Sequence, residues 1–362
     1  MLKYLHQQLK TNWLLSVSLS LAVVLYTLDR GPFYRYIGYH DLKVLLVLFT
    51  MMLISGGLER SGVLRWLSYV FMGRVHGTFQ ATAMLIIITA VFSAFVTNDI
   101  ALMVMVPFTI NVFLSLELSP LWPIIFVTIA ANVGSSLTPF GNPQNIYIYA
   151  YYGLNFLQFI SAIWPFTVFG VFLLLVSAYI FLDKRSICIK GEVSTQPWAI
   201  WYVLSFPVFL YGVLSDNVLL LAMLAVVLSI YSLWHKSVWA DVDFSLLLIF
   251  VSFFFISGSI THMYNPEPLT SPKSVFLLSA FLSQVISNVP TATILADITP
   301  LWKPLLIGVS VGGVGTLIAS MANLISYRIY VRRVGRDRYL WYFHIYSFAF
   351  LAILMTFMWF WV

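Results

Sequence analysis

The sequence predicts an all-α polytopic membrane protein with about nine spans and two re-entrant hairpins. These form two inverted-topology repeats whose broken helices lie at mid-membrane. Of the 362 residues, 61% are apolar and only 9% are charged, which is more apolar surface than a water-soluble fold can bury. Apolar runs near twenty residues, long enough to cross a hydrocarbon core of about 30 Å, recur along the whole chain. Short polar or glycine- and proline-containing stretches interrupt some of these runs.

The apolar runs divide into spans, hairpins and one interfacial segment. Segment 59–75 carries Glu59, Arg60 and Arg65 among apolar residues, which is typical of a helix lying in the membrane interface. No small-x-small cleavage site follows the first run, so we interpret it as a retained span and not as a signal peptide. The predicted spans are 13–28, 42–58, 121–152, 157–183, 198–213, 217–234, 243–262, 302–330 and 339–362, with hairpins at 77–117 and 273–300.

The basic residues predict the orientation in the membrane. With the N-terminus in the cytoplasm, 14 lysines and arginines fall inside and 5 outside, as the positive-inside rule requires. The inner set is Lys3, Lys10, Arg60, Arg65, Arg74, Lys184, Arg185, Lys190, Lys236, Arg328, Arg332, Arg333, Arg336 and Arg338. The outer set is Arg30, Arg35, Lys43, Lys273 and Lys303. We therefore expect a multi-pass protein of the cell (inner) membrane with its C-terminus outside. Because the net charge of +6 is spread over loops, it indicates a lipid bilayer and no nucleic acid as partner.

The chain also repeats itself, which predicts its domain organisation. Segment 21–25 recurs as 224–228, and the apolar run ending in Ser55-Gly56 recurs as the one ending in Ser257-Gly258, at offsets of 203 and 202. At an offset of 190, Ser93 and Asn98 match Ser283 and Asn288. At an offset of 178, three residues of the first broken helix match three of the second: Gly134, Thr138 and Asn145 correspond to Gly312, Thr316 and Asn323. An odd number of crossings separates equivalent segments, so the halves should be inverted. The N-terminal repeat is 1–197, with broken helix 121–152, and the C-terminal repeat is 198–362, with broken helix 302–330.

Four breaks, at 97–99, 134–145, 287–291 and 312–323, are the candidate functional site. Non-helical chain at membrane depth is tolerated only where it is buried in protein or lines a polar cavity. Freed carbonyls and hydroxyls suit Na⁺, while N–H groups at half-helix starts attract an anion. Simple caps or helix–helix hydrogen bonds are the alternative roles. The candidate substrate residues are Thr97, Asn98, Asn142, Asn145, Ser287, Asn288, Thr291, Ser320 and Asn323, and the candidate coupling-ion residues are Asp99, Ser135, Thr138, Gly141, Gly315 and Thr316.

Two carboxylates near the hairpins differ in their expected roles. Asp99 directly follows a hairpin tip, where an unpaired charge costs at least about 2.5–3.5 kcal/mol. We expect it to bind Na⁺ or to carry a transported proton, and the alternative is a carboxylate that only caps the second arm. Asp297 lies nine residues after Asn288, about 13 Å along a helix, so it should lie near the outer surface.

At these motifs the sequence resembles the ion transporter superfamily. The resemblance rests on Thr97-Asn98-Asp99-Ile100-Ala101, Gly141-Asn142-Pro143-Gln144-Asn145-Ile146 and Ser287-Asn288-Val289-Pro290-Thr291, and it covers nearly the whole chain. It is strongest to citrate-transporter-like and arsenite-permease-like proteins and more distant to divalent anion/sodium symporters and to one sodium/proton antiporter family. The resemblance implies re-entrant hairpins, broken helices, a homodimer and an elevator movement. In the sodium-coupled dicarboxylate branch both hairpin tips resemble Ser-Asn-Thr, from which the tips of this chain depart.

These features together predict an ion-coupled secondary active transporter, driven by Na⁺ or H⁺, of a small anion or oxyanion. The alternative is a Na⁺/H⁺ antiporter centred on Asp99, and a channel is a lesser alternative. An enzyme is not expected, because the six histidines are scattered without metal-ligand or general-base spacing. Cys188 is the only cysteine, so the chain has no intrachain disulfide and no thiolate cluster for a metal. Apart from the coupling ion, no cofactor is expected.

Overall fold

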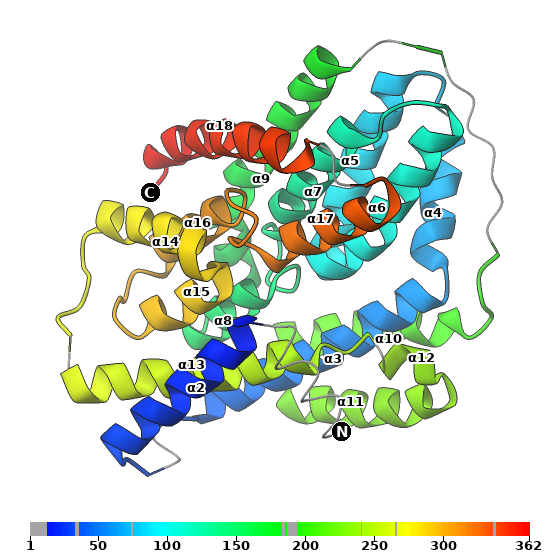
Figure 1. Ribbon diagram of the computed structural model, residues 1–362. Helices are drawn as coiled ribbons and strands as arrows, with labels where there is room; N and C mark the ends of the chain where they lie inside the picture. Colours follow the sequence, from blue (N-terminus) through cyan, green and yellow to red (C-terminus); the bar gives the residue numbers. More distant parts are fainter. Residues whose placement is uncertain are drawn as a thin grey trace.

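The chain is folded into helices throughout the part that the structure describes (Figure 1). This computed structural model describes residues 13–32, 36–73, 75–182, 185–186, 194–239, 241–264, 266–335 and 338–362. Within these ranges no strand forms, and one isolated bridge pairs Gly77 with Ser186. The predicted all-α polytopic architecture is confirmed. Lys3, Lys10, Arg35, Arg74, Lys184, Cys188, Lys190 and Arg336 lie outside the described residues.

The helix bounds agree closely with the predicted segments. The first half contains α2 (Trp13–Asp29), α3 (Tyr39–Arg60), α4 (Val63–Met72), α5 (Thr78–Phe95), α6 (Asn98–Ser115), α7 (Leu121–Ser135), α8 (Pro143–Tyr151) and α9 (Phe156–Phe181). The second half contains α10 (Ala199–Leu214), α11 (Val218–Trp234), α12 (Lys236–Trp239), α13 (Phe244–Tyr264), α14 (Pro272–Ile286), α15 (Asn288–Ala296), α16 (Trp302–Gly312), α17 (Met321–Arg333) and α18 (Tyr339–Trp359).

Among the described residues, six helices are long and apolar enough to cross a membrane by length and composition: α3, α5, α6, α9, α13 and α18. Three other predicted spans, α2, α10 and α11, are apolar helices of 16 or 17 residues, about 25 Å long. The two arms of the first hairpin, α5 and α6, each have 18 residues, so their length also suits full crossings. That this hairpin is re-entrant stays a prediction.

The segment predicted to lie in the interface forms a separate short helix. Gly62 adopts a left-handed conformation (φ 78°) that ends the path of α3 and starts α4 in a new direction. Helix α4 buries Leu64, Ser68 and Met72 on one face, at helical spacing. Arg65, next to Leu64, is exposed. The helix is therefore amphipathic, and its place in the interface stays a prediction.

The two halves pack against each other reciprocally. Helix α2 packs on α13, and its repeat counterpart α11 packs on α3, which is the counterpart of α13. The hairpin arms α5 and α14 pack on the first parts of the broken helices, α7 and α16. The second parts cross over, because α8 packs on α15 and α17 packs on α6 (Figure 1). This packing supports the internal repeat, while the opposite orientation of the halves in a membrane stays a prediction.

Helix ends lie on opposite sides of the molecule. The ends of α2 and α13 and the C-terminus lie at the left in Figure 1, whereas α12 lies at the right. Which side faces the cytoplasm stays a prediction.

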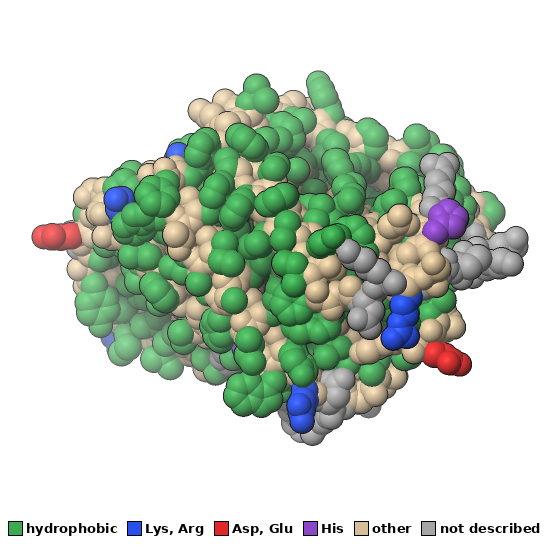
Figure 2. All heavy atoms as spheres, turned by 90° about the horizontal axis from the view of Figure 1, so that it is seen from above, with side chains coloured by type: hydrophobic (Ala, Val, Ile, Leu, Met, Phe, Trp, Pro, Cys, Tyr) green, Lys and Arg blue, Asp and Glu red, His purple; other side chains and the backbone are tan. Residues whose placement is uncertain are grey.

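The exterior is mostly apolar, as a surface covered by lipid must be. Large exposed side chains include Leu28, Leu157, Ile180 and Leu219, each at least 67% exposed. Figure 2 shows hydrophobic side chains over most of one face, with the few charged side chains near its periphery. A water-soluble monomer rarely exposes continuous apolar patches of this kind.

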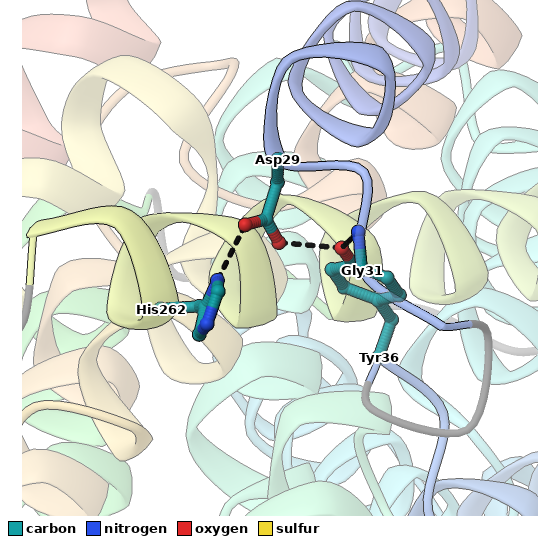
Figure 3. Close-up of polar contacts among 4 residues, drawn as sticks. All are labelled: Asp29, Gly31, Tyr36 and His262. Atoms are coloured by element: carbon teal, nitrogen blue, oxygen red, sulfur yellow. Dashed lines mark hydrogen bonds and ion pairs between the residues drawn. The ribbon is translucent and has the colours of Figure 1, made fainter.

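A polar cluster fixes the end of α2 to α13 (Figure 3). The side chain of Asp29, only 2% exposed, accepts a hydrogen bond of 2.5 Å from the Tyr36 hydroxyl and pairs with Nδ1 of His262 in the last turn of α13. The hydroxyl of Tyr36 also accepts from the Gly31 N–H at 2.8 Å. The cluster holds the α2–α3 connection in place, and its residues are not among those of the four breaks.

Candidate functional site

The four predicted interruptions are present. Helix α7 ends at Ser135 and α8 begins at Pro143, where the missing N–H of proline is harmless at the first helical position. Helix α16 ends at Gly312, and α17 begins after the extended Ser320. The hairpins turn at residues 96–97 and at Ser287.

The first break is held by hydrogen bonds to its own backbone. The Asn98 N–H at the start of α6 donates to the Gly141 carbonyl at 3.1 Å, which fastens the hairpin tip to the break. Within α8, Nδ2 of Asn145 donates to the carbonyls of Ser135 at 3.1 Å and Thr138 at 3.0 Å. One side chain thus satisfies the carbonyls that the end of α7 leaves without helical partners.

The second break has the same bonds at the equivalent positions. The Asn288 N–H donates to the Ala319 carbonyl at 3.0 Å. Nδ2 of Asn323 donates to the carbonyls of Gly313 at 3.2 Å and Thr316 at 2.9 Å. In these bonds, each residue of the second broken helix lies 178 residues after the equivalent residue of the first broken helix, which is the offset seen in the sequence. The two halves therefore build the same local structure.

Asn132 joins the two halves. It lies in α7, is 2% exposed, and its Oδ1 accepts from Nδ2 of Asn98 at 3.3 Å. Its own Nδ2 donates to Oδ1 of Asn323 at 2.7 Å. This chain of three amides runs from the first hairpin to the second broken helix.

The breaks converge on one small pocket. Its volume is about 20 Å³, room for about one or two water molecules. Its lining residues are Asn98, Asp99, Asn142, Pro143, Gln144, Leu246, Asn288, Val289, Ser320 and Met321. All of them except Leu246 are the cap or the first residues of α6, α8, α15 or α17. Four helix N-termini, each carrying roughly half a positive charge, thus surround the pocket.

The predicted substrate residues fall into two groups. Asn98, Asn142, Asn288 and Ser320 line the pocket. The remaining residues are buried behind it and support the turns: Thr97, Asn145, Ser287, Thr291 and Asn323. Within this second group Thr291 Oγ1, for example, donates to the Ser287 carbonyl at 2.8 Å inside α15.

Among the predicted coupling-ion residues, Asp99 alone lines the pocket. The hydroxyls of Ser135, Thr138 and Thr316 donate to the backbone carbonyls of Asn132, Ala94 and Gln284, respectively. Their lone pairs are not consumed by these bonds, although Ser135 Oγ also accepts from Nδ2 of Asn142 at 2.6 Å. A Cβ on Gly141 or on Gly315 would overlap its neighbours, so both glycines permit close packing of the breaks.

The electrostatics of the pocket come from one carboxylate and from helix ends. Within the described structure, Asp99 Oδ1 is buried without a hydrogen-bond partner, and so are Asn142 Oδ1 and both amide atoms of Gln144. Among the described lining residues none is basic. Buried polar atoms are normally satisfied, so this group of unsatisfied atoms in one pocket points to a ligand.

Three amides of the site were not among the candidate residues, although one of them, Gln144, lies within the predicted break 134–145. These are Asn132, Gln144 and Gln284, whose Nε2 donates to the Gly312 carbonyl at 2.7 Å and whose Oε1 accepts from the Thr316 N–H at 2.8 Å. Their common signal was an amide side chain within, or at the edge of, a strongly apolar helix. The carboxylate of Asp297, which we expected near the outer surface, is half-buried and accepts from Tyr151 at 2.8 Å and from Ser257 at 2.5 Å.

The second hairpin tip has a strained backbone. Ser287 has φ 76° and ψ 156°, a conformation that residues other than glycine rarely adopt. Its counterpart Thr97 has an ordinary extended conformation with φ −64°. The tips of the two hairpins therefore differ in conformation although their neighbours make equivalent bonds.

Comparison with known proteins gives consistent similarities. The profile of a family described as "Citrate transporter" matches residues 13–301. An uncharacterized transporter of Methanocaldococcus jannaschii is 32% identical over 308 residues, which cover 82% of this chain and 84% of the relative. Inner membrane protein YbiR of Escherichia coli is 31% identical over 324 residues, covering 85% of this chain and 84% of YbiR. A silicon efflux transporter of Oryza sativa subsp. japonica is 31% identical over 131 residues, which cover 36% of this chain and 27% of the relative.

Proposed function

The chain belongs to the citrate transporter family of membrane transporters, and from this premise we propose that it is an ion-coupled secondary active transporter of a small anion or oxyanion. The coupling ion is Na⁺ or H⁺. The transport cycle is alternating access of the elevator type, and the transporter is a homodimer in the cell membrane.

The observation that carries this proposal is the pocket at which four helices begin. An anion there is stabilised by the positive ends of α6, α8, α15 and α17, without any basic side chain among the described lining residues. A channel would need a continuous pore, whereas this pocket is small and is lined by matched residues of two repeats, as in carriers with alternating access.

Asp99 supplies the coupling in this proposal. An ionised carboxylate in the pocket repels an anion, and at a separation of about 4 Å and an effective dielectric constant of 20 the interaction is about 4 kcal/mol. A Na⁺ or a proton on Asp99 removes this repulsion. Cation and anion therefore promote each other's binding, which is the thermodynamic requirement for symport.

The pocket is closed around its centre in this conformation. A volume of about 20 Å³ holds one or two water molecules, so an inorganic oxyanion and citrate alike enter only after the helix starts separate. One relative is described as a silicon efflux transporter, which supports an inorganic solute for this chain as well. We therefore place small oxyanions before tricarboxylates.

A Na⁺/H⁺ antiporter centred on Asp99 is the second candidate, because the carboxylate is buried with one oxygen unpartnered among the described residues. Proteoliposomes distinguish the two functions. Na⁺ alone dissipates an imposed pH gradient if the protein is an antiporter, whereas an anion carrier requires its substrate. Saturable counterflow of a labelled oxyanion supports the leading proposal, and non-saturable flux without counterflow would favour a channel.

A further inference from the structure

Gln144 is the most unusual polar side chain of the pocket. It is the second residue of α8, lines the pocket and is only 1% exposed. Within the described residues, neither its Nε2 nor its Oε1 has a hydrogen-bond partner. At the equivalent position of the other half, 178 residues later, stands Ala322. The local fold therefore forms without an amide at this position.

A half-buried glutamine, Gln284, shows what a structural role looks like. Gln284 uses its Nε2 for the carbonyls of Ala280 at 2.9 Å and Gly312 at 2.7 Å, and its Oε1 accepts from the Thr316 N–H at 2.8 Å. Two of these bonds, to the Gly312 carbonyl and from the Thr316 N–H, fasten α14 to the second break, and the third lies within α14. Gln144 makes no such bond among the described residues, so packing does not account for it.

The two amide atoms of Gln144 define the ligand that would satisfy them. The N–H groups need an acceptor oxygen, and the carbonyl needs a donor hydrogen. A fully deprotonated oxyanion offers only acceptor oxygens, so the carbonyl oxygen Oε1 of Gln144 would remain without a hydrogen-bond donor. An oxyanion or oxyacid that keeps one O–H beside a bare oxygen matches both atoms at once.

We propose that Gln144 is a specificity-determining residue that selects ligands with a retained O–H group next to an acceptor oxygen. This rests on the proposed function, because it concerns the substrate of the same pocket. Asn142 Oδ1, a further buried acceptor without a partner among the described residues, lines the same pocket and suits the same donor-bearing ligand. A site built to bond an O–H rejects an analogue without it, since the buried carbonyl would remain unpaired.

The first test needs no ligand. Gln144→Met and the matched control Gln284→Met have similar side-chain volumes but should act in opposite directions on the thermal stability of the purified protein. Removing unsatisfied polar atoms should raise the Tm of Gln144→Met by about 2 °C, whereas the loss of its three bonds should lower the Tm of Gln284→Met. A fall in Tm for Gln144→Met comparable to that of the control would overturn the proposal.

The second test uses inorganic phosphate, which carries O–H groups at neutral pH, and sulfate, which carries none. Wild-type protein should be stabilised by phosphate at concentrations at least about tenfold below those needed for sulfate, and Gln144→Met should lose this preference. Equal stabilisation by both ions, or by neither, would overturn the assigned ligand class. Phosphate counterflow in proteoliposomes tests the proposed function separately. A phosphate-induced Tm shift without counterflow would refute transport of phosphate but leave the assignment of Gln144 intact.

Discussion

Replacing Asn132 by leucine tests whether the amide chain between the two halves stabilises the fold. The change removes the acceptor of Asn98 Nδ2 and the donor to Asn323 Oδ1, and both partners remain buried. An interhelical hydrogen bond in a membrane protein contributes on average only about 0.6 kcal/mol. An unsatisfied buried group costs about 1–3 kcal/mol. The loss of stability therefore comes mainly from Asn98 Nδ2 and Asn323 Oδ1, which are left without a hydrogen-bond partner.

The expected loss is therefore about 2–6 kcal/mol for Asn132→Leu. Unfolding entropy scales with chain length at about 2.1 cal/mol/K per residue, so for 362 residues this loss corresponds to a fall in Tm of about 3–8 °C. The assay is thermal unfolding of the purified protein in detergent, followed by intrinsic tryptophan fluorescence.

The internal repeat provides a matched control. Ser310 occupies the position equivalent to Asn132 in α16, and its buried hydroxyl has no hydrogen-bond partner among the described residues. Ser310→Ala should therefore leave the Tm unchanged or raise it slightly. The reasoning fails if Asn132→Leu lowers the Tm by less than about 1 °C, or if Ser310→Ala lowers it as much as Asn132→Leu does.

Three further predictions concern coupling, close packing and backbone strain. Asp99→Asn should abolish the dependence of uptake on Na⁺ or pH while the protein still purifies as a folded species, and an unchanged ion dependence would contradict the coupling role. Gly134→Ala should abolish folding, because the added Cβ would overlap the backbone of Ala90. Gly73→Ala is the control and should be tolerated, because its added Cβ would have ordinary contact distances. The measurement is the yield of monodisperse protein in size-exclusion chromatography. Ser287→Gly should have a Tm about 1–3 °C above that of Ser287→Ala, because only glycine relieves the strain at φ 76°, and equal values would argue against that strain.

The helices and their breaks could be predicted from the sequence because local chemistry determines them. Pro143 lacks an N–H and suits the first turn of a helix, so the sequence predicts a helix start within the break 134–145, and the structure places it at Pro143. Gly312 with its neighbouring glycines marks the end of α16, and the short side chain of Ser320 marks the residue before α17. The hydrogen bonds of Asn145 and Asn323 also follow the offset of 178 residues, because their equivalent side chains bond to equivalent carbonyls.

The sequence does not predict which polar residues line the pocket and which bond to the backbone, because this depends on the direction in which each side chain points. Asn142 and Asn145 belong to the same motif, yet Asn142 lines the pocket and Asn145 bonds to backbone carbonyls behind it. Asn132 and Gln284 lie inside apolar helices, where periodicity gives no sign of a partner more than twenty residues away. Long-range pairing of this kind is decided by tertiary packing and not by local sequence.

The chemistry of the pocket lies in the differences between the two halves. The backbone bonds and helix starts are matched, and this symmetry alone brings four positive helix ends to one point. Two lining positions of the first half carry a polar side chain where the second half has an apolar residue, since Asp99 corresponds to Val289 and Gln144 corresponds to Ala322. A symmetric set of side chains would offer a ligand two equivalent orientations, whereas this set places the carboxylate and the free amide on one side. If the halves exchange conformations during transport, these groups stay on the first half, so the coupling ion and the O–H of the substrate should contact the same half in both states.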